Sequence, residues 1–213
     1  MNRRLIAIAA GAAFVAALSA CGSQTDERVT PTTESSAATL EEVAPSGEAA
    51  SAVASAIAAN PFVAIDCISG QATGFDQAPQ GTTLGPVTAS LQPTGAPTIT
   101  LQTGAAPAAE LGIADVAEGT GAEAKAGDTL TVDYCGVGLG TDAMFDSSWQ
   151  RGQPATFPLD GVIQGWQQGV PGMKVGGTRL LVIPGELGYG AQGTQGIPPN
   201  ETLIFVVTLK AIS

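Results

Sequence analysis

Residues 162–172 read VIQGWQQGVPG and lie near the middle of the C-terminal half of the chain. Within that half, Val162–Val170 is the only convincing short helix. Gly165 and Gly169 are costly inside a helix, but glycine is useful where a helix and a sheet must approach closely. We therefore predict one short helix that lies close against a β-sheet.

Three strand-like runs surround this helix in the sequence. In the run Thr129–Cys135, Leu130, Val132 and Tyr134 would share one face of a strand, and the residues between them would share the other. Arg179–Ile183 is a second run, which a Pro-Gly pair ends, and Leu203–Leu209 is a third. Several strands with one short helix predict an α+β domain, in which an antiparallel β-sheet is wrapped around the helix.

Residues 61–106 contain shorter strand-like pieces at 62–65, 87–91 and 98–101, each bounded by glycine or proline. Their apolar content is too small for a core of their own. We therefore expect 61–106 to be a strand-rich extension packed on the main domain, which would occupy 107–213.

The first 20 residues have the features of an export signal. Arg3 and Arg4 precede an uncharged run that is shorter than the about 20 residues of a membrane span. The run ends in Leu18-Ser19-Ala20-Cys21, which resembles the bacterial lipobox, in which the cysteine becomes the first mature residue and carries lipid. We predict a lipoprotein signal peptide at 1–20 and attachment through Cys21 to the extracytoplasmic face of the cell membrane. Ordinary secretion with a free cysteine and an uncleaved anchor are the alternatives.

Residues 21–60 resemble a tether. They are rich in Ser, Thr, Ala, Glu and Pro and have almost no large apolar residues. Such a stretch cannot bury enough surface to offset the entropy of ordering it. We expect a disordered linker.

Composition excludes several classes of function. The formal net charge is −11, which repels phosphate backbones, so that nucleic acid is a poor partner. The chain has no histidine, the usual base of a serine or cysteine nucleophile and the commonest metal ligand. With no Cys-x-x-Cys pair either, we expect no metal site and no cofactor.

The three cysteines suggest one disulfide. Lipidation would use Cys21, and export places Cys67 and Cys135 in an oxidising compartment. A Cys67–Cys135 bridge would attach the extension to the main domain. Two separately buried thiols are the alternative.

Six motifs follow one another in the last half of the chain, and together they resemble one known family. They are VDY at 132–134, MFDSS at 144–148, VIQGW at 162–166, GVPGMKVG at 169–176, LGYG at 187–190 and IPPNETL at 197–203. Residues 110–213 resemble the FKBP-type peptidyl-prolyl cis–trans isomerases. The resemblance implies an FKBP-like fold and a pocket that binds proline.

The same resemblance assigns roles to residues of this pocket. Trp166 would form the floor under the pyrrolidine ring, while the N–H of Ile163 and the hydroxyl of Tyr189 would bind substrate carbonyls. Asp146, held by neighbouring hydroxyls, would complete the polar wall. The expected catalytic residues are thus Tyr134, Asp146, Ile163, Trp166 and Tyr189. The expected substrate-binding residues are Phe145, Phe157, Val162, Ile197 and Phe205.

Rotation about the bond before proline breaks no covalent bond, so that a chain without histidine can catalyse it. We expect a monomeric isomerase that assists the folding of exported proteins, binds proline-containing polypeptides and, as the resemblance implies, binds macrolide inhibitors. The loop at 193–196 is one residue shorter than in the family. This difference motivates the alternative of a non-catalytic proline-binding module or holdase; a purely structural envelope lipoprotein is a third reading.

Overall fold

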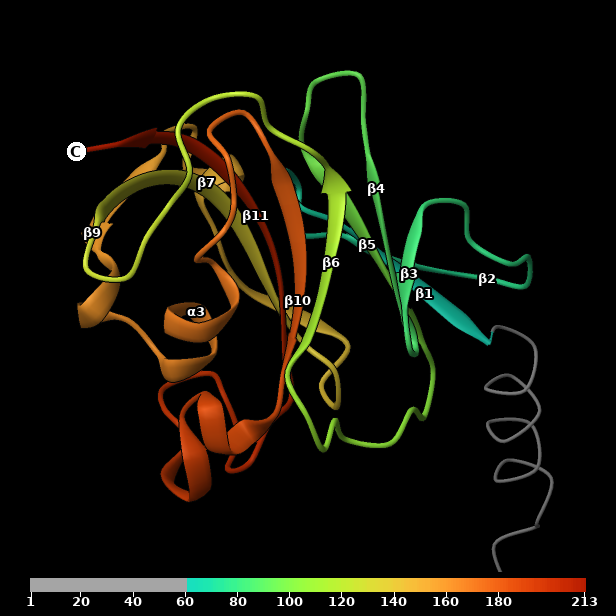
Figure 1. The fold of residues 1–213 in the computed structure, drawn as a ribbon. Coiled ribbons are helices and arrows are strands. Elements are labelled where there is room, and N and C mark those ends of the chain that lie inside the picture. Colours follow the sequence, from blue (N-terminus) through green and yellow to red (C-terminus); the bar gives the residue numbers. More distant parts are fainter. Residues whose placement is uncertain (1–60) are drawn as a thin grey trace, which may run out of the picture. The chain divides into compact units, whose positions relative to one another are not determined.

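The computed structural model describes residues 61–213, which form two antiparallel β-sheets and a few short helices (Figure 1). The N-terminal sheet has the strand order β2-β1-β5-β4-β3, and the C-terminal sheet has the order β6-β10-β11-β7-β8. The strands of the first are β1 (Phe62–Asp66), β2 (Ala72–Phe75), β3 (Thr82–Leu84), β4 (Val87–Leu91) and β5 (Pro97–Gln102). Those of the second are β6 (Gly112–Ala117), β7 (Thr129–Gly138), β8 (Ala143–Ser147), β10 (Thr178–Ile183) and β11 (Leu203–Ile212), and β9 (Ala155–Pro158) pairs with the first half of β7.

The helices of the described part are short. They are α2 (Ser148–Arg151), α3 (Gln164–Gly169) and three 3-10 turns, η1 (Leu159–Gly161), η2 (Gly185–Leu187) and η3 (Gly190–Gln192). None of the helices between residues 61 and 213 is long and apolar enough to cross a membrane. The predicted signal peptide at 1–20, the predicted lipidation site Cys21 and the predicted linker at 21–60 lie outside the described residues.

The central strands of the C-terminal sheet are buried on both faces. All six residues of β10 are buried, and from Leu180 to Ile183 successive residues belong to different apolar clusters. Leu181 and Ile183 face α3, whereas Leu180 and Val182 face the N-terminal sheet. Since neighbouring residues of a strand point to opposite faces, the continuous apolar run at 180–183 fits a strand between two layers. In Figure 1, α3 and the N-terminal sheet accordingly lie on opposite sides of the C-terminal sheet.

Helix α3 lies very close to the sheet because it carries glycine where it meets β10. A Cβ atom on Gly165 would overlap the side chain of Ile183. The observed helix is shorter than the predicted Val162–Val170, because Ile163 has an extended backbone (φ −59°, ψ 150°) and precedes the first helical residue. Ile163 is therefore the N-cap of α3 and not one of its helical residues.

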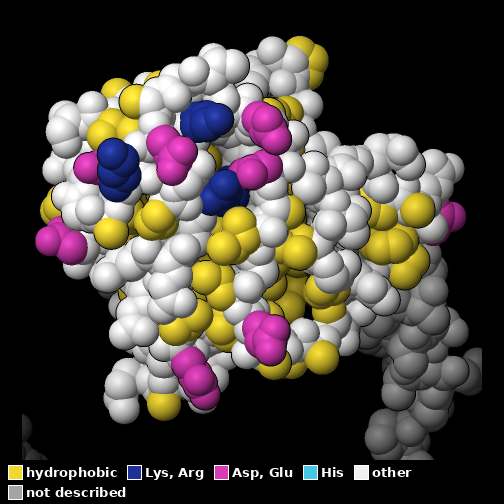
Figure 2. Space-filling model, viewed as in Figure 1, with side chains coloured by type: hydrophobic (Ala, Val, Ile, Leu, Met, Phe, Trp, Pro, Cys, Tyr) yellow, Lys and Arg dark blue, Asp and Glu magenta, His cyan; other side chains and the backbone are white. Residues whose placement is uncertain are grey.

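Arg179 on β10 holds the C-terminal end of α3. Its Nη1 donates to the carbonyl oxygens of Gly169 and Pro171 at 2.9 and 3.2 Å. Its Nε and Nη2 donate to the two carboxylate oxygens of Asp115 on β6 at 2.7 and 3.1 Å. A guanidinium can be buried here because each of these donors has an acceptor. On the face drawn in Figure 2, basic side chains likewise lie beside acidic ones.

The N-terminal sheet buries its apolar face against the C-terminal sheet. Ile65, Val87, Ile99 and Leu101 pack there in one cluster with side chains of β7, β10 and β11. The cluster is shared, so the two sheets enclose a common apolar layer. The predicted boundary at residue 106 stays a prediction.

A disulfide crosses this shared layer. It joins Cys67, just after β1, to Cys135 on β7, 68 residues further along the chain. Both cysteines are fully buried. The pairing predicted from the cysteine count is therefore the one that the structure contains.

Candidate active site

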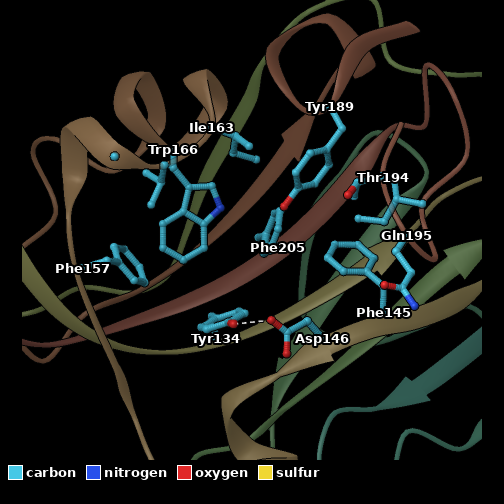
Figure 3. Close-up of a pocket in the computed structure, with 13 residues that line it drawn as sticks. Tyr134, Phe145, Asp146, Phe157, Ile163, Trp166, Tyr189, Thr194, Gln195 and Phe205 are labelled. Atoms are coloured by element: carbon cyan, nitrogen blue, oxygen red, sulfur yellow. Dashed lines mark hydrogen bonds between the residues drawn. The ribbon is translucent and has the colours of Figure 1, made fainter. Parts of the chain in front are cut away.

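A cavity of about 500 Å³ lies between α3 and the C-terminal sheet (Figure 3). Aromatic side chains form much of its wall, and we call it the aromatic pocket. It is lined by Tyr134, Phe145, Asp146, Phe157, Gly161, Val162, Ile163, Trp166, Tyr189, Thr194, Gln195, Ile197 and Phe205. The structure thus brings together all ten side chains that the sequence assigned to a binding site; their individual roles stay predictions.

Trp166 forms the bottom of the aromatic pocket. It lies in α3 and is only 4% exposed. Its ring centroid lies 5.2 Å from that of Phe205, 5.3 Å from Phe157 and 5.7 Å from Tyr134, and all three pairs meet edge to face. Such contacts favour one ring orientation, so the face of the indole is fixed before any ligand arrives.

One side of the pocket depends on a glycine of β7. A Cβ atom on Gly136 would lie 2.6 Å from the ring of Phe145 and 2.8 Å from that of Phe205. Without it, these two rings cover the strand and meet edge to face, with centroids 5.5 Å apart. A backbone position without a side chain therefore provides the space for the aromatic wall.

The polar part of the wall is a group of three side chains. The Tyr134 hydroxyl donates a short hydrogen bond to Asp146, and Arg151 forms an ion pair with the same carboxylate. Arg151 Nη2 also donates to the Tyr134 oxygen at 2.9 Å, and its guanidinium carbon lies 5.4 Å from the centre of the Tyr134 ring. The carboxylate of Asp146 is therefore held in one orientation by two donors.

Burial raises the pKa of the Tyr134 phenol, and the hydrogen bond to Asp146 raises this pKa further, whereas Arg151 lowers it. The pKa of Arg151 is raised, chiefly by its hydrogen bond with Tyr134. Tyr134 therefore stays a protonated donor throughout the neutral range. The sequence had suggested that hydroxyls hold Asp146; one of its partners is instead a guanidinium.

Two donors of the pocket are left without protein acceptors. In the described part of the chain, neither the N–H of Ile163 nor the hydroxyl of Tyr189 makes a hydrogen bond. Tyr189 is 40% exposed, and Figure 3 shows its hydroxyl directed toward Phe205 inside the pocket. A ligand with carbonyl oxygens could accept from both groups.

Comparison with known proteins decides the family. The model of the FKBP-type peptidyl-prolyl cis-trans isomerases matches residues 121–210. A probable FK506-binding protein of Corynebacterium glutamicum is 50% identical over 113 residues, which are 53% of this chain and 95% of the relative. The chain belongs to this family of isomerases. An FK506-binding protein of Streptomyces anulatus is 52% identical over 113 residues, 51% of this chain and 91% of the relative.

Membership of the family confirms the predicted activity and enzyme class, peptidyl-prolyl cis–trans isomerisation. It also agrees with the observed fold of antiparallel sheets and few helices. A further relative, the isomerase FkpA of Escherichia coli, is 50% identical over 94 residues, which are 44% of this chain but only 34% of FkpA. These three relatives match between 44% and 53% of this chain.

Several lining residues were not found from the sequence. Thr194 and Gln195 belong to the short loop before Ile197, and Gly161 closes η1. Arg151 was missed because it acts on the pocket from α2, a four-residue helix without apolar periodicity. Between residues 61 and 213, no group of three or more acidic, histidine or cysteine side chains is placed to bind a metal ion.

Proposed function

We propose that the aromatic pocket is where this isomerase acts, with a proline ring on the indole of Trp166. The observation that carries the proposal is that the ten residues expected from the family resemblance line one cavity, with two unpaired donors at Ile163 and Tyr189. The ring of proline matches the flat apolar floor. The carbonyl groups on either side of it match the two donors.

Catalysis in such a pocket needs no attacking group. The barrier to rotation about a peptide bond is about 18–20 kcal/mol, because rotation breaks amide resonance. The twisted amide is less dipolar than the planar one, so an apolar pocket disfavours the planar state more. Hydrogen bonds from Ile163 and Tyr189 that fit only the twisted geometry lower the barrier by differential binding.

Tyr134 and Asp146 provide the polar complement of this wall. Their mutual hydrogen bond and the ion pair with Arg151 fix a negative charge beside the apolar floor. A charge that is already oriented costs no reorganisation when the dipole of the substrate amide changes. We assign the catalytic role to Tyr134, Asp146, Ile163, Trp166 and Tyr189, and substrate contact to Phe145, Phe157, Val162, Ile197 and Phe205.

An isomerisation assay on a peptide with a single bond before proline tests this assignment. The protein should accelerate exchange, and Asp146→Val should lower kcat/KM by about tenfold, or ~1.4 kcal/mol. Added macrolide of the FK506 type should inhibit, since two relatives are named for binding it. Peptide binding without acceleration would favour the alternative, a binding module or holdase. An Asp146→Val variant as active as the natural protein would refute the role of Asp146.

We further propose that the protein assists folding of exported proteins as a monomer attached to the outer face of the cell membrane through lipid on Cys21. The export-signal pattern at 1–20 supports this location, and a disulfide between Cys67 and Cys135 suits an oxidising compartment. Several acyl chains on one cysteine would hold firmly, because each buried methylene adds about 0.8 kcal/mol.

The lipid anchor can be tested on the protein from its own host. We expect mass spectrometry to find Cys21 as an acylated first residue and to find the protein in the membrane fraction. Cys21→Ala should release it into the soluble fraction or block processing. An unmodified Cys21 in secreted protein would contradict the proposal and favour ordinary secretion.

A further inference from the structure

The pocket is linked to the N-terminal sheet by a buried hydrogen bond. Ser147, the last residue of β8, is 1% exposed, and its hydroxyl donates to the carbonyl oxygen of Cys67 at 2.7 Å. The two residues are 80 positions apart in the sequence. Cys67 lies outside the 121–210 region that the family model matches. A segment beyond that region therefore contacts the residue next to Asp146.

Ser147 also begins the helix that carries Arg151. It is the N-cap of α2, and its hydroxyl oxygen accepts from the backbone N–H of Gln150 at 3.3 Å. A serine at this position stabilises the first turn of a helix. Helix α2 is only four residues long, so its first turn contains the whole helix, and Arg151 at its end pairs with Asp146. The position of Arg151 thus depends on how Ser147 is held.

Two more connections fix the junction of β8 and α2, at Ser147 and Ser148, to β7. The Ser148 hydroxyl accepts from the backbone N–H of Tyr134 at 2.9 Å and donates to Asp133 at 3.0 Å. The disulfide partner of Cys67 is Cys135, which follows Tyr134 directly. Cys135 and Ser147 are also opposite each other in the pairing of β7 with β8. Cys67 therefore contacts both strands that supply the polar wall, one by a covalent bond and the other by a hydrogen bond.

We propose that Ser147 is a positioning residue of the isomerase site, and that the N-terminal sheet acts through it to hold Asp146 and Arg151 in their places. Ser147 itself does not line the pocket. Its hydroxyl joins the carbonyl of Cys67, which the disulfide holds, to the start of α2. Loss of this hydroxyl would leave the Cys67 carbonyl without its buried donor and α2 without its cap. The proposal rests on the roles assigned to Tyr134 and Asp146.

The first test is kinetic and uses the full chain. Ser147→Ala should lower kcat/KM for a proline peptide by about fivefold to tenfold, mostly in kcat, because the wall is misplaced while the apolar floor remains. Ser147→Thr keeps the hydroxyl and should recover most of the activity. The matched control is Thr178→Val, which removes a buried hydroxyl that bonds Thr208 at 2.9 Å on the C-terminal sheet away from the pocket. It should destabilise the protein similarly and leave kcat/KM unchanged.

The second test reads the polar wall directly. The chain has two tyrosines, so Tyr189→Phe leaves Tyr134 as the only phenol. In that background, absorbance titration should give a Tyr134 pKa above that of a free phenol, because burial and the bond to Asp146 both raise it. Adding Ser147→Ala should lower the Tyr134 pKa toward that of a free phenol, because the displaced junction of β8 and α2 lets water reach the phenol. Adding Thr178→Val should not move it.

The outcomes separate the two levels of the proposal. If Asp146→Val loses activity as expected while Ser147→Ala has both the natural kcat/KM and the natural Tyr134 titration, the positioning role is refuted and the role of Asp146 stands. If Asp146→Val keeps full activity, the role assigned to Asp146 is wrong, and the positioning proposal that rests on it is wrong as well. A Ser147→Thr variant that loses activity as Ser147→Ala does, although it folds and keeps the Tyr134 titration, would also count against the role of the hydroxyl.

Discussion

Trp166→Leu should reduce kcat/KM for a proline peptide by about 100-fold, equivalent to ~2.7 kcal/mol of transition-state stabilisation. Leucine cannot present a flat face beneath the pyrrolidine ring. The change also removes three edge-to-face contacts, those of the indole with Tyr134, Phe157 and Phe205. The neighbouring rings then lose the partner that orients them, and the pocket loses both its floor and its shape.

The same substitution lowers the free energy of unfolding by about 2–3 kcal/mol, because a buried aromatic side chain is shortened. Activity must therefore be compared at a temperature where the variant is folded. Phe75→Leu is a suitable control, because Phe75 stacks on Phe62 in the N-terminal sheet at 5.8 Å and does not line the pocket. A fully folded Trp166→Leu variant with natural activity would refute the role of the indole.

Removing the disulfide is the second large change. A Cys67→Ala/Cys135→Ala variant should have a free energy of unfolding lower by about 4 kcal/mol, because the bond closes a loop of 68 residues in the unfolded chain. Both sulfur atoms lie in the apolar layer shared by the two sheets, so alanine also leaves a small cavity there. Equilibrium denaturation by urea measures the loss.

A reductant provides the matched control for the disulfide. It should lower the stability of the natural protein and leave the double variant unchanged. If the double variant unfolds at the same urea concentration as the natural protein, the bond contributes little and the entropic account is wrong. If the N-terminal sheet positions the pocket, the double variant should also lose isomerase activity at temperatures where it stays folded.

All six strand-like runs that the sequence predicted, at 62–65, 87–91, 98–101, 129–135, 179–183 and 203–209, fall within observed strands. Arg179–Ile183 lies within β10 and Leu203–Leu209 lies within β11. These two runs were recognisable without alternating polar and apolar residues, because a strand buried on both faces is apolar along its whole length. Helix α3 was predicted too long at both ends. Val162 and Ile163 instead have extended backbones, which their β-branched side chains favour.

The residues that line the candidate site were predicted from the sequence, whereas the residues that hold them in place were not. The resemblance located all ten expected lining residues: eight lie within the six motifs, and Phe157 and Phe205 lie outside them. Arg151, Ser147 and Ser148 act through contacts with residues 5 to 80 positions away, and neither periodicity nor composition records such contacts. The disulfide was predictable, because a count of three cysteines with one at a lipidation motif leaves a single pair.

Nuclear magnetic resonance of the protein with a peptide that contains one proline tests directly whether catalysis takes place on the indole of Trp166. The chain has two tryptophans, Trp166 in the pocket and Trp149 in α2, which is partly buried against the apolar layer of the two sheets and does not line the pocket. At catalytic concentrations, the protein should speed up exchange between the cis and trans forms of the peptide. On addition of excess peptide, the indole N–H resonance of Trp166 should shift, while that of Trp149 hardly moves. Faster exchange with no change at Trp166, or a shift at Trp166 with no faster exchange, would contradict catalysis on the indole floor.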